Sequence, residues 1–488
     1  MFRHSTTLLI TLCSMYLMSC SDNNQIVGVG QQITVFSGSS ANSANTANTS
    51  SSTSCSLEEK NIRIVNLFKR DYLFNEEVQI PADYQVLESS DLVQALKVSE
   101  KERYSFWVED AQAYDRSFSQ GISSGLFGFR PMYQLSETQL PEDGRFTLYL
   151  VEINSPAHKA GLRRGDTILS IDGITSVEIF TQFSSMNDAE RYEYHVQLLG
   201  LDHSKDELTI VWQSAGDVQM FEQTIIRDSY TSDVVESAKI IDNQADTKTG
   251  YLAYRSFSEF STERLIEAFD LFDTESVDNL IFDFRSNGGG LVSLAGFIAN
   301  SSLNEQNTLT GESLLNYEYN ERRSGLNQTF NFANDDYDIG ADKVVVLIDA
   351  GSCSASELVI NMLLPYVDVT IIGDQSSCGK PYGMEPAQIC DGYLFPVTLK
   401  FTNANNDADY IDGFSPDCVV KDTVEYNWGD VKDPQIDEAL HILNGGNCRT
   451  TESITVSLEA KNIQKQSKID IVSTYSDYEN PNAPLFKY

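Results

Sequence analysis

Basic side chains are scarce in this 488-residue chain, which contains 34 Lys and Arg residues against 71 Asp and Glu residues. The net charge of −37 repels the phosphates of nucleic acids and the headgroups of anionic lipids. The sequence therefore predicts no nucleic-acid partner and no electrostatic attachment to membranes. Because 41% of the residues are hydrophobic, the chain has enough apolar side chains for the cores of about two or three domains.

Histidine is also scarce, with five residues, and the chain has neither a Cys-x-x-Cys pair nor histidine-rich spacing. The scarcity of histidine disfavours a Ser-His-Asp hydrolase, and the lack of metal-binding cysteine and histidine spacing disfavours a metal centre. We therefore predict a protein without a metal or another cofactor. Carboxylate pairs do not indicate a glycosidase here, because acidic residues are frequent throughout the chain.

A hydrophobic run long enough to span a membrane is missing, but the first 20 residues are typical of a secretion signal. They contain a short apolar core at Leu8–Leu12 and end in Leu17-Met-Ser-Cys20. That tetrapeptide resembles the lipobox of bacterial lipoproteins, which implies removal of residues 1–19 and lipidation of Cys20. We expect a protein of the bacterial cell envelope, lipid-anchored to the outer membrane and facing the periplasm, because Ser21 follows the cysteine. The alternative is an ordinary signal peptide with a chance cysteine.

Six cysteines remain when the signal peptide and the lipidated residue are set aside. An even number suits an oxidising compartment, where disulfides persist. The sequence alone does not fix the pairing, for which a Cys378–Cys390 bridge and a Cys418–Cys448 bridge are two candidates. The six residues are Cys55, Cys353, Cys378, Cys390, Cys418 and Cys448.

Ser354 and Lys380 form the most informative pair in the chain. The apolar run Lys343–Asp349 predicts a buried strand, residues 354–364 predict the helix after it, and Val369–Gly373 predicts the next strand. Ser354 then begins the helix, and Lys380 lies in the loop beyond the second strand. A helix N-terminus offers free backbone N–H groups, and a buried lysine is neutral enough to accept the proton of a serine. The pair therefore predicts acyl transfer without histidine.

Both residues also have simpler interpretations. Ser354-Ala-Ser-Glu357 fits a capping box, in which the serine and the glutamate only satisfy the helix N-terminus. Gly373 to Gly379-Lys380 is similar to a phosphate-binding loop, but five residues separate its glycines instead of four. Pro381 also stands where Ser or Thr would hold magnesium, so we reject the nucleotide interpretation.

Three motifs in order give the chain a family resemblance. Leu280-Ile-Phe-Asp-Phe-Arg-Ser-Asn-Gly-Gly-Gly290 precedes Ser354-Ala-Ser-Glu357, and Gly373…Gly379-Lys380 follows. They resemble the Asp-x-Arg-x-Asn-x-Gly-Gly, Ser-Ala-Ser-Glu and Gly-Lys motifs of the C-terminal processing peptidases, which are tail-specific serine–lysine proteases. The resemblance covers about residues 57–445. It implies that Ser354 is the nucleophile, that Lys380 is the general base, and that the N–H groups of Gly289 and Ala355 form the oxyanion hole.

The chain departs from this family pattern at three places. The loop that leads to Lys380 is one residue longer than the family pattern, and Cys353 stands where a small residue such as Ala is usual. Met384 replaces the glutamine that often follows the lysine by four, which leaves open the group that orients the lysine. Asp283 and Arg285 are expected to hold the glycine loop rather than to take part in the chemistry.

Residues 119–228 resemble a PDZ domain. Ser155–Gly173 combines a short helix, a Gly-Asp turn, an alternating strand and an Asp-Gly turn. Such domains bind a protein C-terminus as an added strand and hold its carboxylate with backbone N–H groups. A PDZ fold used only as a scaffold is the alternative. The five residues that resemble the carboxylate-binding loop are Gly125, Leu126, Phe127, Gly128 and Phe129.

The fold class we predict is α/β, in a multidomain α+β arrangement. Residues 1–19 are the signal peptide, and 20–56 are the lipidated N-terminus with a flexible tether rich in Ser, Asn, Thr and Ala. A small N-terminal helical region (57–118) and the PDZ-like β-rich domain (119–228) follow. Residues 245–445 alternate strands and helices, which predicts an α/β layered catalytic core, and 446–488 form a C-terminal extension of unassigned function.

The resemblance implies a serine-type endopeptidase that cleaves envelope or periplasmic proteins near their C-termini. Its partners would be protein or peptide C-termini, captured by the PDZ-like domain. The alternative is a catalytically inactive lipoprotein adaptor that binds C-terminal peptides. No transmembrane helix is expected in the mature chain.

Overall fold

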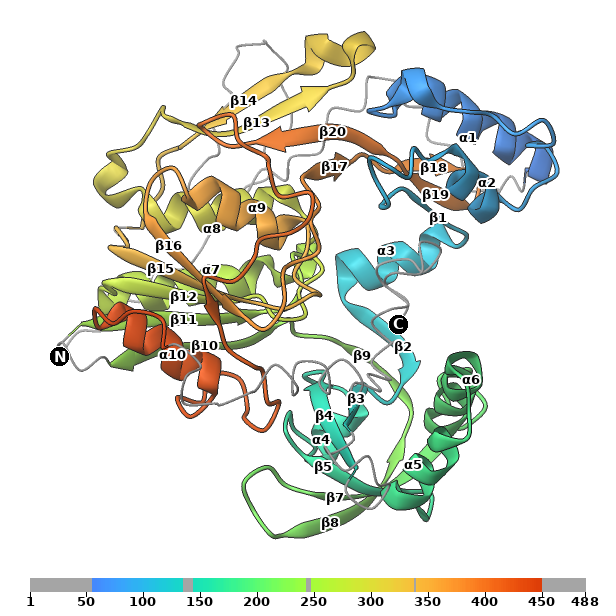
Figure 1. The fold of residues 1–488 in the computed structure, drawn as a ribbon, viewed down its shortest axis with the longest axis vertical. Helices are drawn as coiled ribbons and strands as arrows, with labels where there is room; N and C mark the ends of the chain where they lie inside the picture. The colour runs from blue at the N-terminus through green and yellow to red at the C-terminus, as the bar shows by residue number, and fades with distance from the viewer. Residues whose placement is uncertain (1–54, 135–143, 243–246, 338, 450–488) are drawn as a thin grey trace, which may run out of the picture.

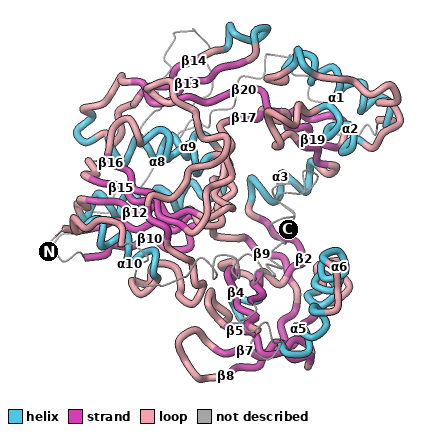
Figure 2. Tube along the Cα trace, viewed as in Figure 1, coloured by secondary structure: helices cyan, strands magenta, loops and turns pink. Residues whose placement is uncertain are grey.

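The structure is a computed structural model that describes residues 55–134, 144–242, 247–337 and 339–449. The predicted signal peptide, Cys20, the tether up to residue 54 and the C-terminal extension from residue 450 lie outside the described residues. The predicted α/β class is confirmed: helices pack on several sheets (Figures 1 and 2). Of the described helices, none is both long and apolar enough to cross a membrane.

A six-stranded sheet forms the centre of the peptidase-like region. It is parallel except for its first strand, which pairs antiparallel with the second. In the middle strands, alternate residues face opposite layers, as a period of two requires. In sheet order, the strands are β10 (Val235–Asp242), β11 (Lys248–Tyr254), β12 (Asn279–Asp283), β15 (Lys343–Ile348), β16 (Asp368–Gly373) and β21 (Cys418–Val419).

Helices cover both faces of this sheet. On one face, Phe282 and Val346 share a core with three helices, α7 (Thr262–Glu275), α8 (Val292–Leu303) and α9 (Ala355–Leu363). On the other face, Ile281 and Val345 pack against α10 (Pro434–Leu443). Figure 1 shows this layered arrangement, in which α10 lies across the sheet from α8 and α9. The layers leave the carboxyl ends of β12, β15 and β16 at one edge, where α/β proteins carry their sites.

A four-stranded sheet lies beside this core and leads to the N-terminal region. It has the order β14-β13-β20-β17, with all neighbours antiparallel. The 3-10 helix η4 (Glu305–Asn307) connects α8 to β13, and η5 (Glu321–Leu326) connects β13 to β14. A further 3-10 helix of the core, η3 (Glu259–Ser261), precedes α7. The strands are β13 (Ser313–Tyr319), β14 (Gln328–Asn331), β17 (Tyr382–Met384) and β20 (Val397–Thr402).

The predicted N-terminal helical region is helical, but it is built together with a distant part of the chain. Its strand β1 (Phe106–Val108) pairs with β19 (Gly392–Phe395), which pairs with β18 (Ala387–Ile389). Phe68 and Leu92 share a core with Leu394, and Cys55 forms a disulfide with Cys390. Figure 1 shows this blue segment against β17–β20. Its other elements are α1 (Leu57–Asp71), η1 (Asn75–Glu77), α2 (Ser89–Leu96) and α3 (Ala111–Gln120).

The PDZ-like region has a core of its own and a sheet of order β3-β4-β5-β7-β8. It is joined to the peptidase-like region by β2 (Ile122–Leu126), which pairs with β9 (Asp228–Thr231). The strands are β3 (Phe129–Gln134), β4 (Arg145–Val151), β5 (Thr167–Ile171), β6 (Ile174–Thr175), β7 (Glu207–Gln213) and β8 (Met220–Ile226), and the helices are α4 (Pro156–Ala160), α5 (Ser176–Ser184) and α6 (Asp188–Leu199).

One of the two candidate disulfides is confirmed and the other is wrong. Cys418 and Cys448 are bonded, but Cys378 is bonded to Cys353, with their Cα atoms 5.1 Å apart, rather than to Cys390. The reason is that Cys390, twelve residues after Cys378, lies at the sheet of β18 and β19 rather than at the loop of Cys378. There it forms a disulfide with Cys55. Nearness in sequence therefore gave the wrong partner for Cys378.

Arg285 is the centre of a buried ionic network, in agreement with the structural role expected for it and Asp283. Its guanidinium is 1% exposed and donates to both oxygens of Asp283, at 2.8 and 2.6 Å, and to Asp433 at 3.0 Å. The hydroxyl of Tyr251 also donates to Asp283, at 2.7 Å. These bonds fix the end of β12, from which the glycine loop starts.

Arg285→Met is expected to destabilise the protein by about 3–5 kcal/mol, because it leaves two buried carboxylates without their cation. Urea unfolding measures the change. Arg264→Met is the control, since Arg264 forms half-exposed ion pairs with Asp233 and Glu267 that contribute less than about 1 kcal/mol. Equal losses in the two variants would contradict a structural role for the buried network.

Candidate active site

Ser354 lies in an unusual backbone conformation at the start of α9. Its φ of +57° and ψ of −111° are strained for a residue with a side chain. Such strain persists where the surrounding structure enforces it, and it is frequent at functional sites. Ser354 is only half-buried, whereas the residues before and after it, Cys353 and Ala355, are buried. The turn between β15 and α9 therefore presents the hydroxyl side chain at the sheet edge.

The glycine loop after β12 lies directly against Ser354. Gly289 has a φ of +98°, and a Cβ atom there would lie 2.7 Å from the Cβ of Ser354 and 2.9 Å from the backbone nitrogen of Ala355. Only glycine fits such an approach. The structure therefore brings together Ser354 and the two residues predicted to form the oxyanion hole.

The two N–H groups predicted to form the oxyanion hole differ in their hydrogen bonding. As the first residue of α9, Ala355 has an N–H group without an acceptor inside the helix. The N–H of Gly289 donates to Oδ1 of Asn287 at 2.9 Å, and Asn287 in turn donates to the carbonyl of Tyr254 at 2.6 Å. An oxygen that enters this site would compete with Asn287 for the Gly289 N–H.

Glu357 connects the serine turn to the lysine loop. Its Oε2 accepts the N–H groups of Ser354 at 2.9 Å and of Lys380 at 2.8 Å. Its Oε1 accepts the hydroxyl of Ser377 at 2.5 Å and the N–H of Gly379 at 2.7 Å. The bond to Ser354 is part of the capping box expected from the sequence, but the other three reach across to the loop after β16. The glutamate therefore fixes Ser354 and Lys380 relative to each other.

Lys380 is buried, with 2% of its surface exposed. Burial lowers its pKa to about 8, against the opposing effect of the Glu102 and Glu357 carboxylates, which raise it. The ion pairs within the described part of the chain do not include Lys380. A lysine with this pKa is partly neutral at mildly alkaline pH, which is the form that accepts a proton.

Two residues beside Lys380 were missed by the sequence reasoning. Glu102 and Tyr104 come from the N-terminal region, about 275 residues earlier in the chain. Glu102 is 2% exposed, and Tyr104 contacts the lysine loop. The short polar segment that holds them, Lys101-Glu-Arg-Tyr-Ser105, has no periodicity that would signal a site.

The predicted carboxylate-binding loop lies between β2 and β3. Gly125 and Leu126 end β2, and Phe127 and Phe129 are buried in the core of the PDZ-like region. Gly128 has a φ of +77°, and a Cβ there would lie 2.1 Å from the Cβ of Ser155, so this turn requires glycine. The strand that follows, β3, is at the edge of its sheet. An edge strand is where a PDZ domain adds a peptide.

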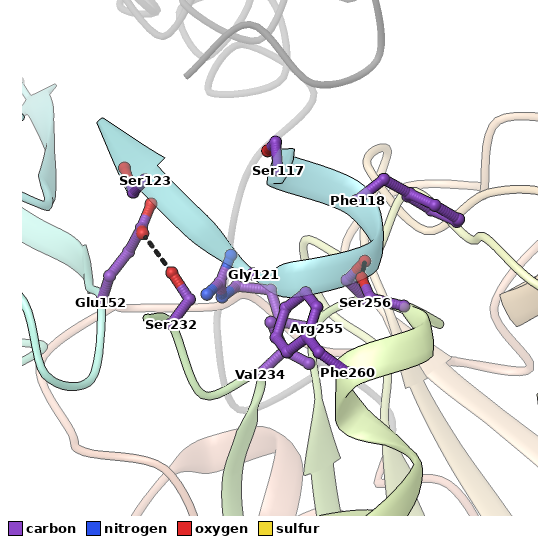
Figure 3. Close-up of a pocket in the computed structure, with 11 residues that line it drawn as sticks. Ser117, Phe118, Gly121, Ser123, Glu152, Ser232, Val234, Arg255, Ser256 and Phe260 are labelled. Atoms are coloured by element: carbon purple, nitrogen blue, oxygen red, sulfur yellow. Dashed lines mark hydrogen bonds between the residues drawn. The ribbon is translucent and has the colours of Figure 1, made fainter. Parts of the chain in front are cut away.

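A pocket lies where the PDZ-like region meets the peptidase-like region (Figure 3). Glu152 accepts the hydroxyl of Ser232 at 3.1 Å on one side, and Arg255 lies on the other. The segment of Arg255 continues to Phe257, whose N–H donates to the carbonyl of Gly289 at 3.0 Å. One wall of the pocket is therefore continuous with the glycine loop beside Ser354.

Comparisons with known proteins match both regions of the chain. Residues 248–420 match the model of peptidase family S41, and residues 148–192 match a PDZ domain. The curated relatives include the carboxyl-terminal-processing protease of Synechocystis, 27% identical over 63% of this chain and 66% of the relative. Residues 248–420 thus match peptidase family S41, and the chain is similar to the C-terminal processing proteases.

Further proteins show the same similarity. Carboxy-terminal processing protease CtpA of Bacillus subtilis is 24% identical over 71% of this chain and 68% of the relative. The chain thus spans about two thirds of the length of these two curated relatives. A solved S41 protease of Bacteroides fragilis has the same fold, with a TM-score of 0.61 and 21% identity, over 78% of this chain and 97% of that one.

Proposed function

We propose that this protein is a serine endopeptidase of family S41 that cleaves envelope or periplasmic proteins near their C-termini by a Ser354–Lys380 dyad. The observation that carries the proposal is the buried Lys380, whose pKa is lowered to about 8. Hydrogen bonds to Glu357 connect the backbone of Lys380 with that of Ser354. The names of the curated relatives, which are carboxyl-terminal processing proteases, support the choice of C-termini as substrates.

In the proposed reaction, the Ser354 hydroxyl attacks the carbonyl carbon of the scissile peptide, and its proton passes to neutral Lys380. The new oxyanion accepts the N–H of Ala355 and the N–H of Gly289, which exchanges its bond with Asn287 for one with the substrate. Collapse of this intermediate expels the amine, which takes the proton from Lys380. A water then attacks the acyl-enzyme and gives its proton to Lys380. The bond between the acyl group and the Ser354 oxygen breaks, the cut protein leaves with a new carboxyl terminus, and Lys380 returns the proton to Ser354.

Capture of the substrate tail is assigned to the PDZ-like region. The tail would pair with the edge strand β3, and the loop of Gly125, Leu126, Phe127, Gly128 and Phe129 would hold its terminal carboxylate. Added strands gain affinity from main-chain hydrogen bonds, which suit substrates of varied sequence. We also propose that the mature chain is anchored by lipid on Cys20 at the outer membrane, with the peptidase in the periplasm.

A reporter protein with an apolar C-terminal tail tests the proposed function. Mature protein without its lipid is expected to cleave the reporter, and Ser354→Ala is expected to lower kcat by about 10⁴–10⁶-fold while it still binds the tail. The same tail with a C-terminal amide should be cut more slowly, because the PDZ-like loop loses its carboxylate. Tail binding without cleavage by the unaltered protein would instead favour the adaptor, for which the structure offers no separate support.

The Cys353–Cys378 disulfide provides a prediction about this site, because it joins the residue before Ser354 to the loop of Lys380. Replacing both cysteines by serine is expected to cost about 3 kcal/mol of stability and to lower kcat about tenfold. The matched control is the Cys418–Cys448 pair, whose sequence separation of 30 is close to the 25 of the first pair. A similar loss of kcat in both double variants would contradict a local role for the first bridge.

A further inference from the structure

The segment Glu102–Ser105 of the N-terminal region lies on the loop that carries Lys380. The hydroxyl of Tyr104 donates to the carbonyl of Gly379 at 2.7 Å and to that of Cys378 at 3.1 Å. The guanidinium of Arg103 also donates to the Cys378 carbonyl. Two successive peptide units just before the lysine are therefore held by side chains from outside the peptidase-like region.

The ring of Tyr104 also faces the lysine side chain itself. The Nζ atom of Lys380 is 5.4 Å from the centre of the ring, which is within the range of a cation–π contact. A ring at this position limits both the positions of the amine and its access to water. One tyrosine thus contacts the backbone before Lys380 and the far end of its side chain.

Tyr104 is itself held in place by a buried carboxylate. Glu102 accepts the N–H groups of Tyr104 and Ser105 and the hydroxyls of Ser105 and Tyr72. The hydroxyl of Ser105 in turn accepts the N–H of Val397. The position of the ring is therefore fixed by several hydrogen bonds.

The chain has no polar side chain at the position where the resemblance expects a glutamine to orient the lysine. Met384 stands there, at the end of β17, and it packs with the apolar clusters shared by the N-terminal region and β19. A thioether is a weak acceptor and no donor, so Met384 is a poor substitute for an amide. Tyr104 lies against the lysine that the missing glutamine would orient.

We propose that Tyr104 is the positioning residue for Lys380, and that the N-terminal region thereby completes the catalytic site of the peptidase core. The inference deepens the proposed function and depends on it for its catalytic meaning. The hydroxyl holds the Cys378–Gly379 backbone, and the ring places and shields the amine.

The charges around Lys380 give the sign of the expected effect. The carboxylates of Glu102 and Glu357 favour the protonated amine, while the exposed guanidinium of Arg103 contacts the loop at the Cys378 carbonyl. Burial outweighs the carboxylates and lowers the pKa. Tyr104→Ala would remove the attraction of the ring for the charged amine, but it would also admit water. Because burial is the largest cause of the shift, the pKa of Lys380 should rise toward the usual value of 10.5.

The titration of Lys380 tests this inference without any need for cleavage. In the Ser354→Ala background, the rate of acetylation of Lys380 by acetic anhydride is followed against pH by mass spectrometry of its peptide. Tyr104→Ala is expected to move the midpoint up by about one pH unit or more. Tyr114→Ala is the matched control, because Tyr114 belongs to the same N-terminal region but its ring packs against Phe395 of β19, 5.0 Å between centroids. It should leave the midpoint unchanged.

Tyr104→Phe keeps the ring and removes only the two hydrogen bonds, so it separates the two contacts. The variant is expected to leave the midpoint of Lys380 acetylation unchanged. Hydrogen exchange in residues 374–381 should become at least fivefold faster. The value of kcat should fall about threefold to tenfold, with KM unchanged. Tyr104→Phe also remains informative if Tyr104→Ala fails to fold. An unchanged midpoint in a folded Tyr104→Ala protein, or unchanged exchange of the loop in Tyr104→Phe, would overturn the inference. If the unaltered protein does not cleave the reporter, but Tyr104→Ala shifts the midpoint and Tyr104→Phe speeds the exchange of the loop, only the proposed function is overturned.

Discussion

Replacing Lys380 by methionine is expected to abolish cleavage and, at the same time, to make the protein more stable. Without the base, kcat/KM should fall by about 10⁴-fold or more. Burial lowers the pKa of Lys380 from 10.5 to about 8. Below pH 8 the buried amine is protonated, and this lowers the free energy of unfolding by about 3 kcal/mol. Methionine fills similar space and removes that cost.

The stability gained in Lys380→Met should decrease as the pH rises. Between pH 8 and 10.5 the unfolded chain binds more protons on this lysine than the folded protein does, so the stability of the unaltered protein rises over that window. The advantage of Lys380→Met should therefore be largest at pH 7 and should disappear near pH 10.5. Urea unfolding at several pH values measures it, with the exposed Lys432→Met as control. A variant less stable than the unaltered protein at pH 7 would show that Lys380 is not a strained base.

Replacing Glu357 by glutamine is expected to weaken both the fold and the proposed reaction. Each carboxylate oxygen accepts two donors, so whichever oxygen becomes an NH₂ group leaves two buried donors without an acceptor. At about 1–3 kcal/mol for each lost partner, the free energy of unfolding should fall by roughly 2–5 kcal/mol. The donors concerned belong to the serine turn and the lysine loop, so kcat should fall as well.

The same variant should shift the pH profile in a known direction. The Glu357 carboxylate raises the pKa of Lys380, so its loss should lower that pKa and move the acid limb of kcat/KM to lower pH. Glu178→Gln is a matched control: Glu178 has the same capping-box position on α5, where it accepts the N–H of Thr175 at 2.8 Å, but it is exposed. It should change stability by less than about 1 kcal/mol. An acid limb that stays in place in Glu357→Gln would contradict the electrostatic coupling.

The peptidase core could be predicted from the sequence because its elements are defined by local patterns. The bounds of α10 follow from a local pattern, because proline stands at its start and apolar residues recur at helical spacing after it. The strand predicted at Lys343–Asp349 ends one residue earlier, at Ile348. The order of the three motifs then placed Ser354, Gly289 and Lys380 at the carboxyl ends of neighbouring strands.

The remaining parts of the site depend on contacts that no local pattern encodes. The helices at 57–96 were recognised, but neither the pairing of β1 with β19 nor the Cys55–Cys390 disulfide could be inferred, because both join residues far apart in the chain. Tyr104 was missed for the same reason. The bond between the Gly289 N–H and Asn287 was missed because it depends on the exact turn of the glycine loop.

The 335 residues that separate Cys55 from Cys390 also set the order in which an active molecule can be made. The N-terminal region leaves the ribosome first, yet the strand and the cysteine that pair with it are made only when most of the chain has followed. Loop closure over such a distance is among the slow steps of folding. A site assembled in this way is complete only when synthesis of the chain is nearly finished.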